Sequence, residues 1–283
     1  MWIEGFYEIF FSDDVDLETK RKCIEFKNRK IPDSLFKYTS TKFLEDKILY
    51  DKIYLPKLEE LNDPIEGYIA FNEPKLQETV IGMIKENSDS EKWSDELLDR
   101  VYNHVIYEEN FFEIKSKEFT DFYSVICLTE KNRNYPMWAH YADDYNGICI
   151  EYDLKDSKRD DLIWMCYPIR YVDEPDKINS ESKYLVQDDV IYHEHLLKKP
   201  TDWKYEKEWR IIICLKENND FRDENVKYQL KFIKPKSIYM GFKIGEDDEK
   251  RITEICESRN INLYKGKFIG RKYGLQFEPI LEY

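Results

Sequence analysis

The feature that most constrains the fold of this chain is a change of sequence texture after Thr120. Runs rich in β-branched and aromatic residues follow one another from there on, and such runs predict strands. Helical patterns lie between them at uneven intervals, which favours an α+β fold over a regular parallel sheet. We therefore expect a single mixed or antiparallel β-sheet as the core, with flanking helices. The predicted strands span residues 122–128, 147–152, 163–171, 209–215, 228–233, 237–242, 262–264 and 274–281.

The first part of the chain predicts more helix than strand. Residues 14–30 form a charged helical pattern that Pro32 ends, and residues 35–38 and 53–55 predict two short strands. Residues 74–118 predict a helical insertion between sheet elements. We find no internal repeat and no low-complexity linker, so we expect residues 1–283 to form one domain. Further helices are predicted at residues 41–49, 136–143, 180–199 and 246–260.

Charge and composition narrow the functional classes. The chain carries 44 basic and 58 acidic residues, a net charge of −14, which argues against non-specific coating of nucleic acid. It has only 9 glycines, and this scarcity argues against a glycine-rich phosphate loop. No run approaches the roughly 18 apolar residues of a membrane span. The first residues lack both a basic segment and a long apolar run, so we expect no signal peptide and a cytoplasmic location.

The six cysteines are scattered singly, without a Cys-x-x-Cys pair. Four of them lie in apolar, strand-like runs, which is typical of buried thiols in a reduced cytosolic protein. We therefore expect unpaired cysteines, no zinc and no other resident metal.

Three clusters of polar and aromatic residues each have a purely structural explanation. Residues 36–40 (Phe-Lys-Tyr-Thr-Ser) are explained by a strand end and a helix cap. Residues 60–67 contain Asn-Asp-Pro, a strong turn initiator, around Asp63 and Glu66. In residues 136–143, the aromatic side chains at helical spacing fit a core face, and His140 fits a partly buried histidine.

A fourth cluster, residues 199–210, is the most informative. Period-two alternation places Glu208 and Arg210 on one strand face and Trp209 on the other. If the strand extends upstream, Glu206 joins the same face, about 7 Å from Glu208 by strand rise. Two carboxylates and a guanidinium then lie beside an apolar run. A solvated charge face at the rim of the sheet is the alternative explanation.

Taken in order, these motifs resemble the bacterial domain-of-unknown-function family 2971, related in pattern to abortive-infection proteins of the AbiGi type. The resemblance runs from Leu35 to Leu281. Two departures concern Thr39, where the family often has Arg, and residues 127–129 (Cys-Leu-Thr), where it often has Cys-Phe-Ser. The motifs that carry it are residues 36–38 (Phe-Lys-Tyr), 62–66 (Asn-Asp-Pro-Ile-Glu), 127–129, 137–142 (Met-Trp-Ala-His-Tyr-Ala), 147–153 (Gly-Ile-Cys-Ile-Glu-Tyr-Asp) and 203–210 (Trp-Lys-Tyr-Glu-Lys-Glu-Trp-Arg).

The order of these motifs is similar to the layout of an ADP-ribosyltransferase. That layout has a polar residue between aromatics in the first strand, a Ser or Thr in the middle segment and a late Glu-x-Glu. The resemblance implies NAD as substrate and an acceptor that is protein, nucleic acid or water. It also implies a role in anti-phage defence or a toxin–antitoxin system, with a cognate defence or antitoxin protein as partner.

Site residues follow from this resemblance and from the chemistry of the bond. Cleavage between nicotinamide and ribose passes through an oxocarbenium-like state, which favours a carboxylate on a ribose hydroxyl. We expect Glu208 in that role and Glu206 at the acceptor. An aromatic face would hold the cationic nicotinamide, and a basic side chain would pair with the pyrophosphate. The residues expected to bind NAD are Lys37, Tyr38, Thr129, Trp138, Tyr141 and Arg210.

Two other functions stay open. The carboxylates Asp63, Glu66, Glu206 and Glu208, with Lys207, suit a metal-dependent nuclease, because clustered carboxylates bind Mg²⁺. Alternatively, the chain is a non-catalytic sensor or antitoxin-like module whose aromatic clusters are core and interface. The roles of Asn62 and His140 are left unassigned.

Overall fold

A computed structural model provides the structure of the protein. It describes residues 2–12, 14–63, 70–71, 77–78, 81–82, 85–86, 93–104, 123–174, 177–178, 194–215, 229–270 and 274–283. The fold is α+β with a single main sheet, as the sequence predicts. The described α-helices are α1 (Trp2–Phe10), α2 (Leu17–Lys30), α4 (Asp95–Asn103), α6 (Tyr135–Tyr141), α7 (Asp160–Trp164) and α9 (Glu246–Arg259), and the shorter helices are η1 (Glu45–Leu49), η2 (Leu58–Glu60) and η6 (Thr201–Glu206).

The main sheet has eight strands in the order β14-β13-β12-β5-β1-β4-β10-β6. Neighbouring strands are antiparallel except β12 and β13, which are parallel and are connected through α9. These strands are β1 (Leu35–Thr39), β4 (Tyr123–Thr129), β5 (Ile148–Tyr152), β6 (Cys166–Pro168), β10 (Glu208–Cys214), β12 (Ser237–Met240), β13 (Asn262–Ile269) and β14 (Gly274–Leu281). The strands outside it pair two by two: β2 (Lys52–Tyr54) with β11 (Gln229–Lys231), β3 (Ala70–Phe71) with β8 (Lys177–Ile178), and β7 (Arg170–Val172) with β9 (Lys198–Pro200).

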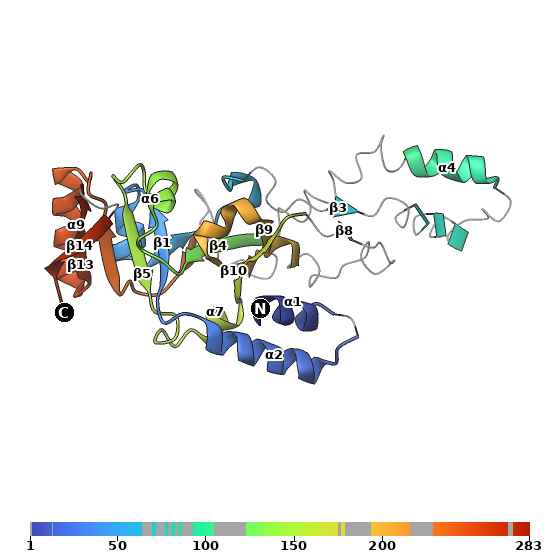
Figure 1. The fold of residues 1–283 in the computed structure, drawn as a ribbon, viewed down its shortest axis with the longest axis horizontal. Helices are drawn as coiled ribbons and strands as arrows, with labels where there is room; N and C mark the ends of the chain where they lie inside the picture. The colour runs from blue at the N-terminus through green and yellow to red at the C-terminus, as the bar shows by residue number, and fades with distance from the viewer. Residues whose placement is uncertain are drawn as a thin grey trace.

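Apolar residues cover both faces of this sheet. One face carries the largest core cluster, which includes Ile150, Ile211 and Ile252 and packs under α9 and η1. The other face carries two smaller clusters, one beneath α1 and one beneath α6. Figure 1 shows the α1–α2 hairpin beside the sheet, with α9 near one end of the molecule and α4 at the other.

The sheet consists of two halves that meet at one register pair. Strand β1 pairs with β5 along its whole length, and β4 does the same with β10. Between β1 and β4, only Phe36 and Thr129 are paired. Thr129 also pairs with Glu208 on its other side, so Phe36, Thr129 and Glu208 lie on one face of three adjacent strands.

Several predicted elements are confirmed, and others need correction. Residues 163–171, predicted as one strand, contain the end of α7 and two short strands. The helix predicted at 41–49 is only the five-residue π-helix η1, and residues 198–200 are strand β9 rather than the end of a helix. Strand β13 extends to Ile269, beyond the predicted residues 262–264, and lies between β14 and β12 in the sheet. Much of the predicted insertion 74–118 lies outside the described residues, which include α4 and three helical residue pairs.

The turn after α6 is unusually tight. Asp143, Asp144 and Tyr145 all have positive φ, between 48° and 69°, which is rare for residues other than glycine. Gly241 allows this loop to approach β12, because a Cβ there would lie 1.9 Å from the carbonyl oxygen of Tyr145. The turn thereby fixes the position of the end of α6 relative to β12.

Candidate active site

The site is built around a buried ion pair at the start of β10. Glu208 Oε1 accepts from Arg210 Nε at 2.7 Å, and Glu208 Oε2 accepts from Arg210 Nη2 at 3.1 Å. The two residues are two positions apart on a strand, so they share a face, as the alternation predicts. Their side chains are 4% and 1% exposed, so the predicted alternative of a solvated charge face is wrong for this pair.

Lys199 on β9 joins a second carboxylate to this pair. Its Nζ lies 2.7 Å from Glu206 Oε2 and 3.3 Å from Glu208 Oε2. The side chains of Lys199 and Glu206 are 4% and 3% exposed. One ammonium group and one guanidinium group therefore face two carboxylates, so the four buried side chains have no net charge when all are ionised. We call Lys199, Glu206, Glu208 and Arg210 the charge cluster.

Glu206 reaches the charge cluster by a different geometry from the predicted one. It ends the 3-10 helix η6 rather than extending β10, and Lys207 after it has a left-handed conformation with φ 47°. Because the turn at Lys207 separates the two glutamates, strand rise does not determine their spacing. Thr129 Oγ1 donates to the carbonyl oxygen of Glu206 and holds the end of η6 against β4.

A short chain of hydrogen bonds connects the charge cluster with the surface. Tyr141 on α6 donates from its hydroxyl to Glu206 Oε1 at 2.6 Å. The exposed Asn62 donates from Nδ2 to the Tyr141 hydroxyl at 2.8 Å. The turn of residues 60–63, helix α6 and the segment of residues 199–210 therefore meet here, although the sequence separates them by up to 150 positions.

Burial and charge act differently on the two carboxyl groups. Burial raises the pKa of Glu206 above its ordinary value of 4.5, and the charge of Lys199 opposes this only in part. Burial also acts to raise the pKa of Glu208, but the charges of Arg210 and Lys199 outweigh it and lower this pKa to about 2. Burial, together with the bond to Glu206, raises the pKa of Tyr141, so its hydroxyl stays a donor. Glu206 is thus the carboxyl group of the two that is closer to titrating near neutral pH.

Trp138 and Tyr38 lie on the same sheet face as the charge cluster, but they belong to the hydrophobic core cluster beneath α6. Trp138 is fully buried and donates from Nε1 to the Asn132 carbonyl oxygen at 2.8 Å. Its ring packs edge-on against Tyr38, at 5.2 Å between centroids. The Tyr38 hydroxyl donates to the carbonyl oxygen of Lys131. Neither ring offers a free face to a ligand, so the predicted cation–π role of Trp138 has no geometric support.

Lys37 lies on the opposite face of the sheet. It pairs with Ile150, whose side chain belongs to the core cluster under α9 and η1, whereas the neighbouring Phe36 and Tyr38 belong to the cluster under α6. Its Nζ donates to the carbonyl oxygen of Cys127 at 3.4 Å, where β1 and β4 separate. Period-two alternation along β1 thus directs the Lys37 side chain to the face opposite Glu208, so the expected contact of Lys37 with the same NAD molecule has no geometric support.

Sequence reasoning gave no role to Lys199, although it belongs to the fourth cluster. The signal that could have indicated Lys199 is its place shortly before Trp203 and two glutamates. An aromatic ring and two carboxylates can together hold a buried ammonium group. The Nζ of Lys199 lies 4.7 Å from the centroid of the Trp203 ring. Tyr171 was also missed, and its hydroxyl accepts from the backbone N–H of Glu208 at 2.9 Å.

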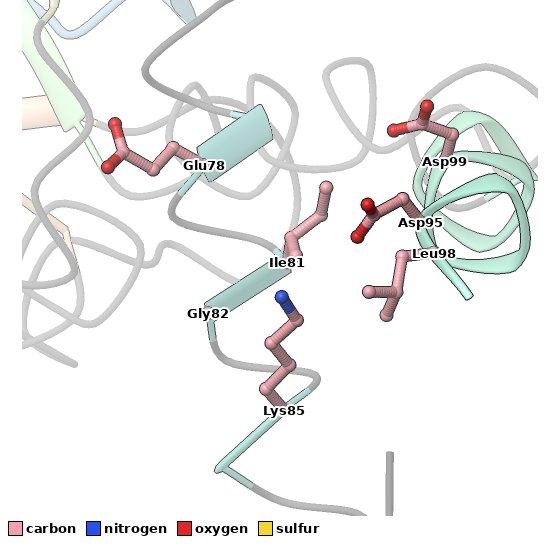
Figure 2. Close-up of a pocket in the computed structure, with 7 residues that line it drawn as sticks. All are labelled: Glu78, Ile81, Gly82, Lys85, Asp95, Leu98 and Asp99. Carbon is pink, nitrogen blue, oxygen red and sulfur yellow. The ribbon is translucent and has the colours of Figure 1, made fainter. Parts of the chain in front are cut away.

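A pocket of about 360 Å³ lies elsewhere, against α4 (Figure 2). Its four charged side chains are all exposed to solvent, so they give no sign of a built binding site. The pocket is lined by Glu78, Ile81, Gly82, Lys85, Asp95, Leu98 and Asp99.

Within the described residues, no group of three or more His, Cys, Asp or Glu side chains could hold a metal ion. Asp63 is buried there, and Glu66 lies outside that part of the chain. All six cysteines are free. No helix in the described ranges is both long and apolar enough to cross a membrane.

Comparison with known proteins supports the family that the motifs indicate. Residues 137–211 match the family model described as a protein of unknown function (DUF2971). This segment runs from α6 to β10 and contains Tyr141 and all four residues of the charge cluster. No match was found among curated proteins or among solved structures.

Proposed function

We propose that the protein is a NAD-consuming enzyme, an ADP-ribosyltransferase or a glycohydrolase. The observation that carries the proposal is Glu206, a buried carboxylate with one oxygen on Lys199 and the other on a tyrosine that leads to the surface. Cleavage of the bond between ribose and nicotinamide develops positive charge on the sugar, and a fixed carboxylate stabilises that charge. The order of motifs similar to an ADP-ribosyltransferase gives further support.

Within the charge cluster, the geometry favours Glu206 over Glu208 as the group that meets the substrate. Both oxygens of Glu208 are held by Arg210, and Lys199 also contacts one of them. Displacing such a bidentate pair in a buried position leaves unpaired charge, which is costly. We therefore assign the ribose-facing role to Glu206 and a positioning role to Glu208, reversing the order expected from the sequence.

The reaction exchanges one bond at C1′ of the ribose for another. The bond between C1′ of the ribose and the nicotinamide nitrogen breaks, and its electron pair leaves with neutral nicotinamide. An oxygen or nitrogen of the acceptor then bonds to C1′, and Glu206 takes the proton that the acceptor loses. With water as the acceptor the reaction is a glycohydrolysis, and with a protein or nucleic acid it is an ADP-ribosyl transfer.

The aromatic surface for nicotinamide is then provided by rings on η6, the helix that ends at Glu206, rather than by the buried Trp138. Trp203 and Tyr205 are half-buried on η6, with ring centroids 6.1 Å apart. Either ring, or that of Tyr141, suits a cationic ring system through cation–π attraction. Arg210 is fully buried and also donates to the Leu196 carbonyl oxygen, so it does not suit the predicted pyrophosphate contact.

The charges of the site disfavour the metal-dependent nuclease. Lys199 and Arg210 already balance the two glutamates, so a divalent cation would meet repulsion from both basic groups. As biological setting we propose bacterial anti-phage defence or a toxin–antitoxin system, with a cognate protein as partner. The resemblance to abortive-infection proteins of the AbiGi type supports this setting.

The test is nicotinamide release from NAD by the purified protein, alone and with added protein or nucleic-acid acceptors. We expect Glu206→Gln to lower the release rate about 10²–10³-fold, the effect typical of losing one electrostatic group at a developing charge. The matched control is Glu254→Gln, an exposed glutamate on α9, which should retain the wild-type rate. Melting temperature serves as the folding control.

Two results would contradict the proposal. Wild-type protein that releases no nicotinamide under any of these conditions favours the non-catalytic binding module. Release that continues at the wild-type rate in folded Glu206→Gln removes the assigned role of that carboxylate.

A further inference from the structure

We infer that Lys199 is a positioning residue that keeps Glu206 ionised and oriented, and that Trp203 keeps water away from this pair. The consequence for catalysis rests on the proposed function, whereas the effect on the charge of Glu206 does not. Neither Lys199 nor Trp203 is assigned a role by the motif resemblance.

The contacts of Lys199 support this role directly. Its Nζ is closer to Glu206, at 2.7 Å, than to Glu208, at 3.3 Å, and all three side chains are at most 4% exposed. Glu208 has Arg210 as a bidentate partner, so the ammonium group of Lys199 is the cation that stabilises the charge of Glu206. Because a buried carboxylate without a cation becomes neutral, loss of Lys199 should leave Glu206 protonated at neutral pH.

Trp203 acts on the same pair from the side of η6. Its ring centroid lies 4.7 Å from Lys199 Nζ, and the ring itself is half-buried. Burial is the largest influence on the pKa of Glu206 and raises it. Removing the indole would admit water to the ion pair and so should act in the opposite direction to loss of Lys199.

The other groups around Glu206 belong to four further elements. Besides Lys199 on β9, they are Glu208 on β10, whose own partner is Arg210, Tyr141 on α6, Tyr171 on β7 and Tyr205 on η6. The tyrosine hydroxyls keep their protons across neutral pH, because burial raises the pKa of each of the three. Glu208 stays ionised beside Arg210. Changes at Lys199 or Trp203 should therefore be seen in the titration of Glu206.

The experiment is a carbon-13 NMR titration of glutamate side-chain carboxyl groups in the full-length protein. Glu206 is assigned by the signal that disappears in Glu206→Gln. We expect Lys199→Met to move the midpoint of this titration upward by about one pH unit or more, and Trp203→Ala to move it downward. Lys199→Arg keeps the charge and should keep the midpoint close to that of the wild type.

Lys204→Met is the matched control, because it removes an exposed lysine from the same short helix and should leave the titration unchanged. If Lys199→Met does not fold, the downward shift in Trp203→Ala still tests the inference. An unchanged Glu206 midpoint in folded Lys199→Met, or in folded Trp203→Ala, overturns it. Since the titration needs no turnover, its result is independent of whether the protein consumes NAD. If it does, the pH profile of nicotinamide release should move in the same direction.

Discussion

At the scale of single residues, ion pairs of similar length differ in how much they contribute to the stability of this protein. Arg210 and Glu208 lie 2.7 Å apart and are almost fully buried, whereas Lys267 and Glu278 lie 2.9 Å apart and are 63% and 60% exposed. Breaking a buried pair leaves an unpaired charge without water, while an exposed pair is replaced by hydration. Burial, rather than distance, therefore decides what each pair contributes.

We expect Arg210→Met to lower the free energy of unfolding by about 3–5 kcal/mol, because it leaves Glu208 buried with Lys199 as a shared cation. Lys267→Met should change it by less than about 1 kcal/mol. Urea denaturation of the two variants measures both values. Equal losses in the two variants would mean that water reaches the charge cluster in the folded protein.

Glu208 also makes the stability depend on pH. Its pKa is about 2 in the folded protein and 4.5 ordinarily, so below pH 4.5 the unfolded chain binds more protons than the folded one. The contribution of Glu208 is complete above about pH 4.5 and is lost as the pH falls towards 2, a change of about 3 kcal/mol. Unfolding free energies of wild type and Glu208→Gln, measured from pH 6 to pH 2, should converge on acidification. A constant difference between them would contradict this linkage.

At the scale of elements, the placement of α6 depends on one close backbone contact. A Cβ on Gly241 would overlap the carbonyl oxygen of Tyr145, whereas a Cβ on Gly5 meets nothing within 4 Å. Gly241→Ala should therefore cost about 2 kcal/mol or more, and Gly5→Ala, inside α1, should stabilise by about 0.5–1 kcal/mol. Thermal unfolding of both variants measures whether each substitution lowers or raises the stability. A neutral Gly241→Ala would show that the turn at residues 143–145 can move away from β12 freely.

Helix α1 is fixed to the sheet by a buried tyrosine. The Tyr7 hydroxyl donates to the carbonyl oxygens of Pro168 and Leu197 at 2.8 and 3.0 Å. Tyr7→Phe keeps the ring but removes this donor, so we expect a loss of about 1–2 kcal/mol. Tyr283→Phe, at an exposed position, should stay within about 0.5 kcal/mol of wild type in the same denaturation assay. Equal stability of both variants would show that water replaces the lost donor.

The sequence predicted elements best where pattern and burial agree. The alternation in β10 and the amphipathic pattern of α9 gave strand and helix close to their observed bounds. The predicted position of Glu206 is wrong, because strand alternation was extended through Lys207. This residue has a left-handed conformation that the sequence does not signal, since it is not a glycine and belongs to no turn motif. For Lys37, the local pattern places the side chain on one face of β1 but does not tell which face of that strand Glu208 shares, and this required the strand pairing.

At the scale of the whole molecule, the charge cluster exists because distant segments meet on one sheet face. Strand β4 lies between β1 and β10, so the motif at residues 127–129 joins the first and last motifs through the pairs of Thr129. The motifs and their order were visible in the sequence, whereas this strand order was not. The convergence of Tyr141, Glu206 and Glu208 was predicted from their chemistry, and the exclusion of Trp138 and Lys37 required the topology.

The same topology predicts how the molecule unfolds. The two halves of the sheet share one register pair, but they also share a core in which Ile211 of one half lies with Ile150 and Ile238 of the other. A common core favours one cooperative transition. Tyr7→Phe acts on the half containing β10 and Gly241→Ala on the half containing β12, so each variant should lower the same single melting temperature. Far-ultraviolet and near-ultraviolet circular dichroism measure this. Two transitions, each lowered by only one variant, would mean that the halves are separate units and that the expectation of one domain is wrong.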